Sequence, residues 1–161
     1  MPTIIIRDAE PGDVPTILRF VRELAMFENE LEAVVATEAD FLRDGFGPAR
    51  RFFCRIALLD DAPAGFTLWF RNYSTWQGRA GLYIEDLYVT EAARGQGVGR
   101  RLLADLARTA VQEKAGRIDL SVLHWNPARG FYEAAGLTHR DDWLPYRIEG
   151  AAIAALATEI P

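Results

Sequence analysis

The sequence contains a single cysteine, Cys54, and only two histidines, His124 and His139, among its 161 residues. One cysteine cannot form an intramolecular disulfide, and so few thiol and imidazole groups predict no metal site. Cys54 also stands in an apolar run without a neighbouring base, which argues against a nucleophile. Catalysis and binding are therefore left to carboxylates, tyrosines, arginines and backbone groups.

An excess of positive charge and long apolar runs are also missing. Lys and Arg total 18 against 23 Asp and Glu, which gives a formal net charge of -5. Binding to nucleic acid needs a basic face, so no nucleic-acid partner is predicted. No run approaches the roughly 20 apolar residues of a membrane helix, and the N-terminus lacks the features of a secretory signal. The expectation is a cytoplasmic protein without a membrane partner.

The remaining composition is that of an ordinary globular protein, with 50% hydrophobic and 25% charged residues. Length and composition predict one domain over residues 1–161. Apolar spacing predicts strands at 4–6, 51–58, 64–73, 81–89, 118–123 and 146–148. It predicts helices at 14–24, 37–45, 98–114 and 126–136, followed by an Ala-rich turn of helix. Helices between strands indicate an α/β sandwich around a mixed sheet.

The segment that carries most chemical information is Arg94-Gly95-Gln96-Gly97-Val98-Gly99, between a predicted strand and a predicted helix. Closely spaced glycines let several backbone N–H groups converge on one anion, and the helix N-terminus adds partial positive charge. The segment therefore predicts a pyrophosphate site. A dinucleotide-binding loop would need a third glycine where Arg100 stands, and no P-loop run is present.

This segment resembles the Arg-x-x-Gly-x-Gly loop of the GNAT acetyltransferases. Further segments resemble the diamine (spermidine/spermine) and thialysine N-acetyltransferase branch, in order, at 22–28, 44–47, 73–79 followed by 83–89, and 122–126 followed by 131–132. The resemblance implies an α/β fold with a mixed, mostly antiparallel, splayed central sheet flanked by helices. It also implies a homodimer that transfers acetyl groups directly from acetyl-CoA to a small cationic amine.

The resemblance assigns the residues that bind the coenzyme. The pantetheine arm would pair with the backbone of Leu87, Tyr88 and Val89, because a splayed edge leaves strand N–H and C=O groups to be satisfied. The diphosphate would lie on Arg94, Gly95, Gln96, Gly97, Val98, Gly99 and Arg100, and Asn126 and Tyr132 would complete the site. Asn126 and Tyr132 are one residue closer together than in the family pattern, and we expect this to be absorbed near Pro127.

Acetyl transfer to an amine requires removal of a proton, because an alkylammonium titrates near ~10.4. A glutamate carboxyl group has a pKa of ~4.3, so direct transfer of the ammonium proton to a carboxylate is uphill by roughly 8 kcal/mol. Glu85 is therefore interpreted as a base that acts through water, or alternatively as a cation-binding group while bulk water takes the proton. Side chains alternate between the two faces of a strand. One face is therefore expected to carry Tyr83, Glu85, Leu87 and Val89, and the opposite face is expected to carry Asp86.

By resemblance, Tyr132 is the acid that protonates the leaving thiolate. The pKa of a tyrosine is ~10 and that of a thiol is ~8.5, so proton transfer from Tyr132 to the thiolate is uphill by only about 2 kcal/mol.

The resemblance also assigns the acceptor site to Phe27, Glu28, Glu85 and Asp142. Phe27 agrees with the thialysine form, whereas the polyamine form has tyrosine there. Carboxylates around an aromatic wall suit an alkylammonium, through charge pairing and cation–π contact. Two alternatives stay open: a protein N-terminal or lysine acetyltransferase, and a non-catalytic CoA-binding sensor. The sequence does not determine the physiological acceptor.

Overall fold

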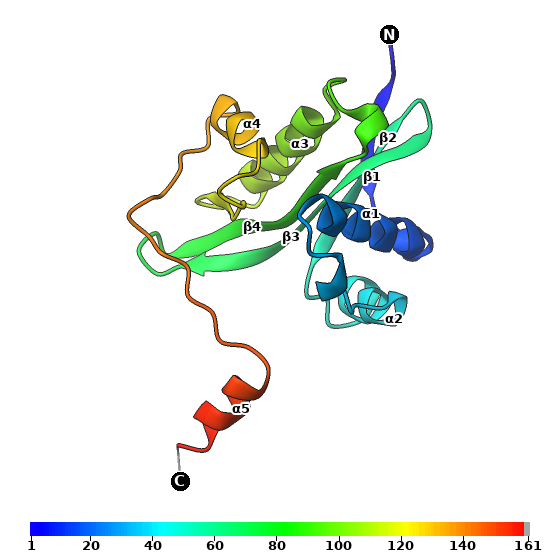
Figure 1. The fold of residues 1–161 in the computed structure, drawn as a ribbon. Coiled ribbons are helices and arrows are strands. Elements are labelled where there is room, and N and C mark those ends of the chain that lie inside the picture. Colours follow the sequence, from blue (N-terminus) through cyan, green and yellow to red (C-terminus); the bar gives the residue numbers. More distant parts are fainter. Residues whose placement is uncertain (160–161) are drawn as a thin grey trace. The chain divides into compact units, whose positions relative to one another are not determined.

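The structure is a computed structural model that describes residues 1–159 (Figure 1). The chain divides into two compact units, residues 1–125 and a second unit that begins at Asn126. The first unit contains a five-stranded sheet. Its strands are β1 (Ile4–Asp8), β2 (Phe53–Leu59), β3 (Ala62–Ser74), β4 (Arg79–Val89) and β5 (Ile118–Leu120), in that spatial order.

The sheet is mixed and mostly antiparallel, as predicted. The pairs from β1 to β4 are antiparallel, and only β4 and β5 run parallel. The turn between β2 and β3 passes through Asp60 and Asp61 at φ of 49° and 65°, a conformation that Asp tolerates better than most residues. Pairing between β4 and β5 ends at Ile84 with Leu120, while β4 continues to Val89. The sheet therefore opens along the end of β4.

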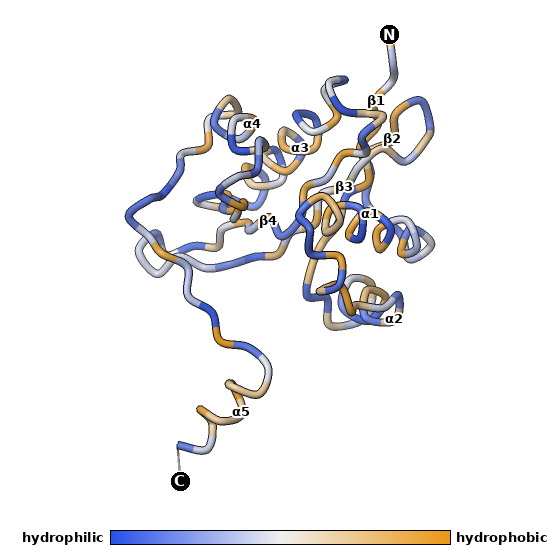
Figure 2. The backbone as a smooth tube through the Cα atoms, in the orientation of Figure 1, coloured by the Kyte–Doolittle hydropathy of each residue, from blue (hydrophilic) through white to orange (hydrophobic). Residues whose placement is uncertain are grey.

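Two amphipathic helices cover the two faces of this sheet (Figure 1). Helix α1 (Val14–Phe27) packs Ile17 and Phe20 onto one face, against a cluster that includes Phe66 of β3. Helix α3 (Val98–Gln112) packs Val98 and Leu102 onto the other face. Both helices alternate apolar and polar residues along each turn (Figure 2), so the apolar side of each is buried against the sheet.

The short elements between α1 and β2 follow the local sequence signals. Thr37 and Asp40 form a capping box, in which the Thr37 hydroxyl accepts from the Asp40 N–H at 3.3 Å and an Asp40 carboxylate oxygen accepts from the Thr37 N–H at 2.9 Å. Helix α2 (Glu38–Phe41) continues into a π-helical turn. That turn spans Leu42–Phe46, and 3₁₀ turns occupy Pro11–Asp13, Leu31–Ala33 and Glu91–Ala93.

The second unit contains α4 (Ala128–Ala134) and α5 (Ala151–Ala157), which agree with the predicted helices. The predicted strand at 146–148 is wrong, because this segment has no strand assignment and the sheet includes none of it. The alternating apolar pattern is present, but a strand also needs a neighbour to pair with, and Pro145 lacks an N–H donor. Within residues 1–159, no helix is long and apolar enough to span a membrane.

Candidate functional site

Strand β4 carries a β-bulge at Glu85, at the point where β4 and β5 separate. Leu68 of β3 pairs with Asp86, and the next residue of β3, Trp69, pairs with Ile84. Glu85 is thus an extra residue without a partner on β3, and its side chain is exposed. A bulge changes the direction of the side chains around it.

The bulge overturns the predicted division of β4 into two faces. Tyr83 pairs with Phe70, which lies on the same face of β3 as the partners of Asp86 and Tyr88. Tyr83 therefore shares a face with Asp86 and Tyr88, and the prediction that Tyr83 shares a face with Leu87 is wrong. The error arose because strict alternation was extended through an inserted residue.

Asp86 faces the α1 side of the sheet and lies in an acidic group that sequence analysis did not include. Burial raises the pKa of Asp86 from 3.8 to about 7, and the negative charges of Glu85 and Glu28 add to this effect. Burial also raises the pKa of Glu28, which follows the last residue of α1, and Glu30 contributes. A signal for Asp86 was present in the sequence, since two adjacent carboxylates interrupt an otherwise apolar strand.

Arg94 contacts the ring of Phe27, so a predicted coenzyme residue touches a predicted acceptor residue. The guanidinium carbon of Arg94 is 5.3 Å from the Phe27 ring centroid and 5.9 Å from that of Tyr88. The Arg94 Nε donates to the carbonyl oxygen of Val89 at 3.2 Å. The Phe27 ring also lies 6.0 Å from that of Trp125. No local pattern signals these contacts, because they join residues far apart in the chain.

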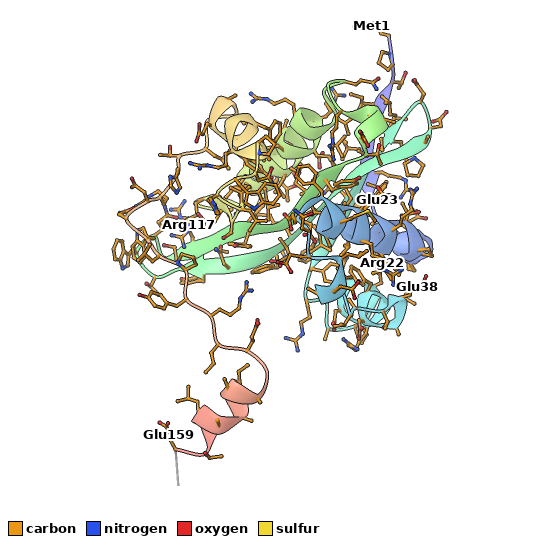
Figure 3. All side chains as sticks on the ribbon, in the orientation of Figure 1. Met1, Arg22, Glu23, Glu38, Arg117 and Glu159 are labelled. Atoms are coloured by element: carbon orange, nitrogen blue, oxygen red, sulfur yellow. The ribbon has the colours of Figure 1, made fainter. Side chains whose placement is uncertain are left out.

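Tyr88 is fixed to α1 by a hydrogen bond. Its hydroxyl donates to the carboxylate of Glu23 at 2.8 Å, and Figure 3 shows Glu23 on α1. Burial and this bond to a carboxylate raise the pKa of Tyr88 to about 12, so its hydroxyl stays protonated at neutral pH. The end of α1 and the end of β4 are therefore linked by Tyr88–Glu23 and by Arg94–Phe27.

The loop from Arg94 to Gly99 has the geometry of an anion site. Gly95 and Gly97 adopt φ of 75° and 86°, in the left-handed region that favours glycine. A Cβ at Gly95 would meet nothing within 4 Å, so the loop surface is open to a ligand. Gly97 immediately precedes α3, and the first turn of a helix presents N–H groups that lack intrahelical partners. Val98 is buried and fixes the helix start.

The edge of β4 next to this loop suits an extended ligand. Leu87 and Val89 pair with β3 on one side, whereas β5 does not pair with β4 beyond Ile84. Backbone groups along 85–89 are therefore available on the β5 side for an amide chain such as pantetheine. The open edge and the glycine loop together fit the acetyl-CoA implied by the sequence. The Gln96 amide donates to the Ala92 carbonyl at 3.0 Å and helps to hold the loop.

Three predicted site residues, Asn126, Tyr132 and Asp142, belong to the second unit. The Asn126 side chain accepts from the N–H of Ala128 at 2.9 Å, at the start of α4. Tyr132 lies within α4 and its ring contacts that of Phe131 edge-on at 5.2 Å. Asp142 is exposed and pairs with Arg140 at 3.4 Å. The roles predicted for these residues stay predictions.

Cys54 is a buried thiol near the start of β2. Burial raises its pKa, which keeps the thiol protonated and unreactive. Among the residues that the structure describes, no group of three or more His, Cys, Asp or Glu side chains is arranged to hold a metal ion.

The sequence model of the Acetyltransferase (GNAT) family matches residues 18–137. The chain belongs to the GNAT acetyltransferase family. It is 37% identical to the thialysine N-epsilon-acetyltransferase of Bos taurus, over 98% of this chain and 99% of that protein. It is also 37% identical to the spermidine/spermine N(1)-acetyltransferase-like protein 1 of Homo sapiens, over 96% of this chain but only 24% of that protein.

The fold of this GNAT chain agrees with a solved structure as well. An integron cassette protein from the mobile metagenome of V. cholerae superposes with a TM-score of 0.79 and 24% identity, covering 96% of this chain and 97% of that one. Family and relatives together make the chain an N-acetyltransferase, in agreement with the sequence analysis. GNAT acetyltransferases use acetyl-CoA as the acetyl donor.

Proposed function

We propose that this GNAT enzyme acetylates the amine of a small cationic acceptor: a diamine, a polyamine or a thialysine-like amino acid. The observation that carries the proposal is the acidic group formed by Glu28, Glu85 and Asp86 at the bulge of β4. Interacting carboxyl groups attract an alkylammonium, and the neighbouring ring of Phe27 adds a cation–π surface. The names of the two relatives, a thialysine acetyltransferase and a spermidine/spermine acetyltransferase-like protein, support the same acceptor class.

In this proposal acetyl-CoA is the co-substrate and supplies the acetyl group as a thioester. The backbone of Leu87, Tyr88 and Val89 orients its pantetheine arm, and the loop from Arg94 to Arg100 holds its diphosphate. Asn126 shapes the start of α4, which carries Tyr132. The Tyr132 hydroxyl donates a proton to the departing sulfur.

In this proposal the carboxyl groups bind the acceptor ammonium and remove its proton. Glu85 takes the ammonium proton through water, and Asp86 and Glu28 hold the cation. By resemblance to the family, Asp142 is also assigned to the acceptor.

A thiol-release assay tests the proposal directly. Acetyl-CoA is mixed with a panel of thialysine, lysine, ornithine, putrescine, spermidine and Lys-containing peptides. We expect release of CoA with at least one small cation and an order of magnitude less with peptides. Glu85→Gln should abolish most turnover, whereas Glu38→Gln, at an exposed position on α2 (Figure 3), should leave it unchanged. Turnover only with peptides would contradict the proposed acceptor class.

We also propose that both units form one acetyltransferase domain, since the family match extends from residue 18 across Asn126 to residue 137. A cytoplasmic location is part of the same proposal. Expression of the second unit alone should give a chain without cooperative unfolding, and independent folding of each unit would contradict the single domain.

We propose a homodimer in which the segment 144–148 packs against a second copy of the chain. Leu144, Tyr146 and Ile148 are 73%, 93% and 50% exposed and alternate as in a strand. Within the described part of the chain, no strand pairs with the outer edge of β5, and Ile118 and Leu120 of β5 are only half-buried. Light scattering should give twice the chain mass, and Tyr146→Glu should give a monomer. A monomeric wild type would contradict the dimer.

A further inference from the structure

If the function proposed above holds, the contact between Arg94 and Phe27 couples the binding of acetyl-CoA to the binding of the cationic acceptor. The Arg94 guanidinium lies over the ring of Phe27, whose side chain is 38% exposed. Phe27 is also the ring expected to receive the ammonium of the acceptor. The same aromatic surface is thus assigned to two cations, one from the protein and one from the substrate.

The two cations compete, because each is attracted by the same ring and the two repel each other. Arg94 is also a residue of the diphosphate loop, where it would meet two negatively charged phosphate groups. Guanidinium pairs with phosphate in a bidentate, charge-assisted arrangement, which is stronger than a cation–π contact at an exposed ring. Bound diphosphate therefore draws Arg94 away from Phe27.

The surrounding contacts make the Arg94 side chain the part that moves. Tyr88 is fixed to α1 by its bond to Glu23, and Phe27 is the last residue of α1 and packs beside Trp125. Arg94 is exposed; its Nε donates to the Val89 carbonyl, and its side chain also interacts with Tyr88.

We propose that Arg94 covers the acceptor ring of Phe27 until the coenzyme diphosphate engages it, so that acetyl-CoA opens the acceptor site. Arg94 is then a positioning residue for the acceptor, in addition to binding the coenzyme. Linkage requires the effect to be reciprocal, so the amine also strengthens coenzyme binding by the same factor.

Calorimetry with thialysine as the amine and CoA as the diphosphate ligand measures this coupling without turnover. For the wild-type enzyme, saturating CoA should lower the Kd of thialysine by at least tenfold. Arg94→Met keeps the apolar stem but removes the charge. This variant should bind thialysine at least fivefold more tightly than wild type when no CoA is present, and CoA should then change the Kd by less than threefold.

Two control variants separate this effect from general loss of charge or fold. Arg101→Met removes a nearby exposed cation on α3 that is not assigned to either ligand, and it should bind thialysine as wild type does. Phe27→Leu should weaken thialysine binding, and in a double-mutant cycle it should remove the effect of Arg94→Met on that binding. Thermal unfolding of each variant confirms that it is folded.

The outcomes distinguish the two proposals. Failure of folded wild-type enzyme to bind CoA overturns the proposed function itself. CoA binding that leaves the Kd of thialysine unchanged overturns only the coupling. The coupling is also overturned if Arg94→Met binds thialysine no more tightly than wild type in the absence of CoA.

Discussion

Replacing Asp86 with asparagine should stabilise the folded chain at alkaline pH and weaken acceptor binding. Burial, together with Glu85 and Glu28, raises the pKa of Asp86 from 3.8 to about 7. Below pH 3.8 the carboxyl group is protonated in both the folded and the unfolded state, so it carries no penalty. As pH rises toward 7 the unfolded chain releases this proton first, and stability falls until the folded state also ionises.

The size of this effect follows from the two pKa values. At about 1.4 kcal/mol for each tenfold change in acidity, moving the pKa from 3.8 to about 7 costs up to ~4 kcal/mol above pH 7. At pH 5 the same carboxyl costs only ~1.5 kcal/mol. Asparagine has nearly the same shape and no charge. The stability advantage of Asp86→Asn should therefore grow by ~2–3 kcal/mol between pH 5 and pH 8.

Urea unfolding followed by tryptophan fluorescence measures this difference at both pH values. Asp61→Asn is the matched control, because Asp61 lies in the exposed β2–β3 turn at a φ that asparagine accepts equally well. This control removes a carboxylate from a turn of the same sheet and leaves Asp86 unchanged. A stability difference for Asp86→Asn that stays constant from pH 5 to pH 8 would refute the reasoning. In kinetics, Asp86→Asn should raise the KM for a cationic acceptor at least tenfold while the Kd of CoA is unchanged.

Three further substitutions test other parts of the site. Tyr132→Phe should lower kcat at least tenfold in single-turnover measurements and leave the Kd of CoA unchanged; an unaltered kcat would remove Tyr132 from the mechanism. Gly97→Ala forces a side chain into φ of 86°, so it should cost about 1–2 kcal/mol of stability and weaken CoA binding in calorimetry, and normal CoA affinity would contradict the loop assignment. Glu85→Gln should lower kcat at least tenfold, whereas a change in KM alone would show that Glu85 binds the cation without acting as base.

Local signals predicted most secondary structure, because each signal and its effect lie within a few residues. The helix predicted at 37–45 begins with a capping box of Thr37 and Asp40, and the strands predicted at 51–58 and 64–73 form the β2–β3 hairpin, which turns at Asp60 and Asp61. The glycine loop before α3 was also predicted, since left-handed glycines and a following helix are properties of the local sequence. The mixed sheet followed from the order of these elements.

The remaining features depend on partners that are distant in sequence. The bulge at Glu85 is defined by its pairing with β3, so alternation within β4 alone assigned Tyr83 to the wrong face. The contact of Arg94 with Phe27 arises from the packing of α1 on the sheet. The segment 146–148 has the pattern of a strand but lacks a neighbour, and pattern alone does not supply one.

The extra residue in β4 also affects how this enzyme can diversify. Because side chains alternate along a strand, losing or gaining one residue near position 85 reverses the orientation of every side chain on one side of the change. Insertions and deletions in this strand would thus alter acceptor preference without substituting any residue that contacts the amine.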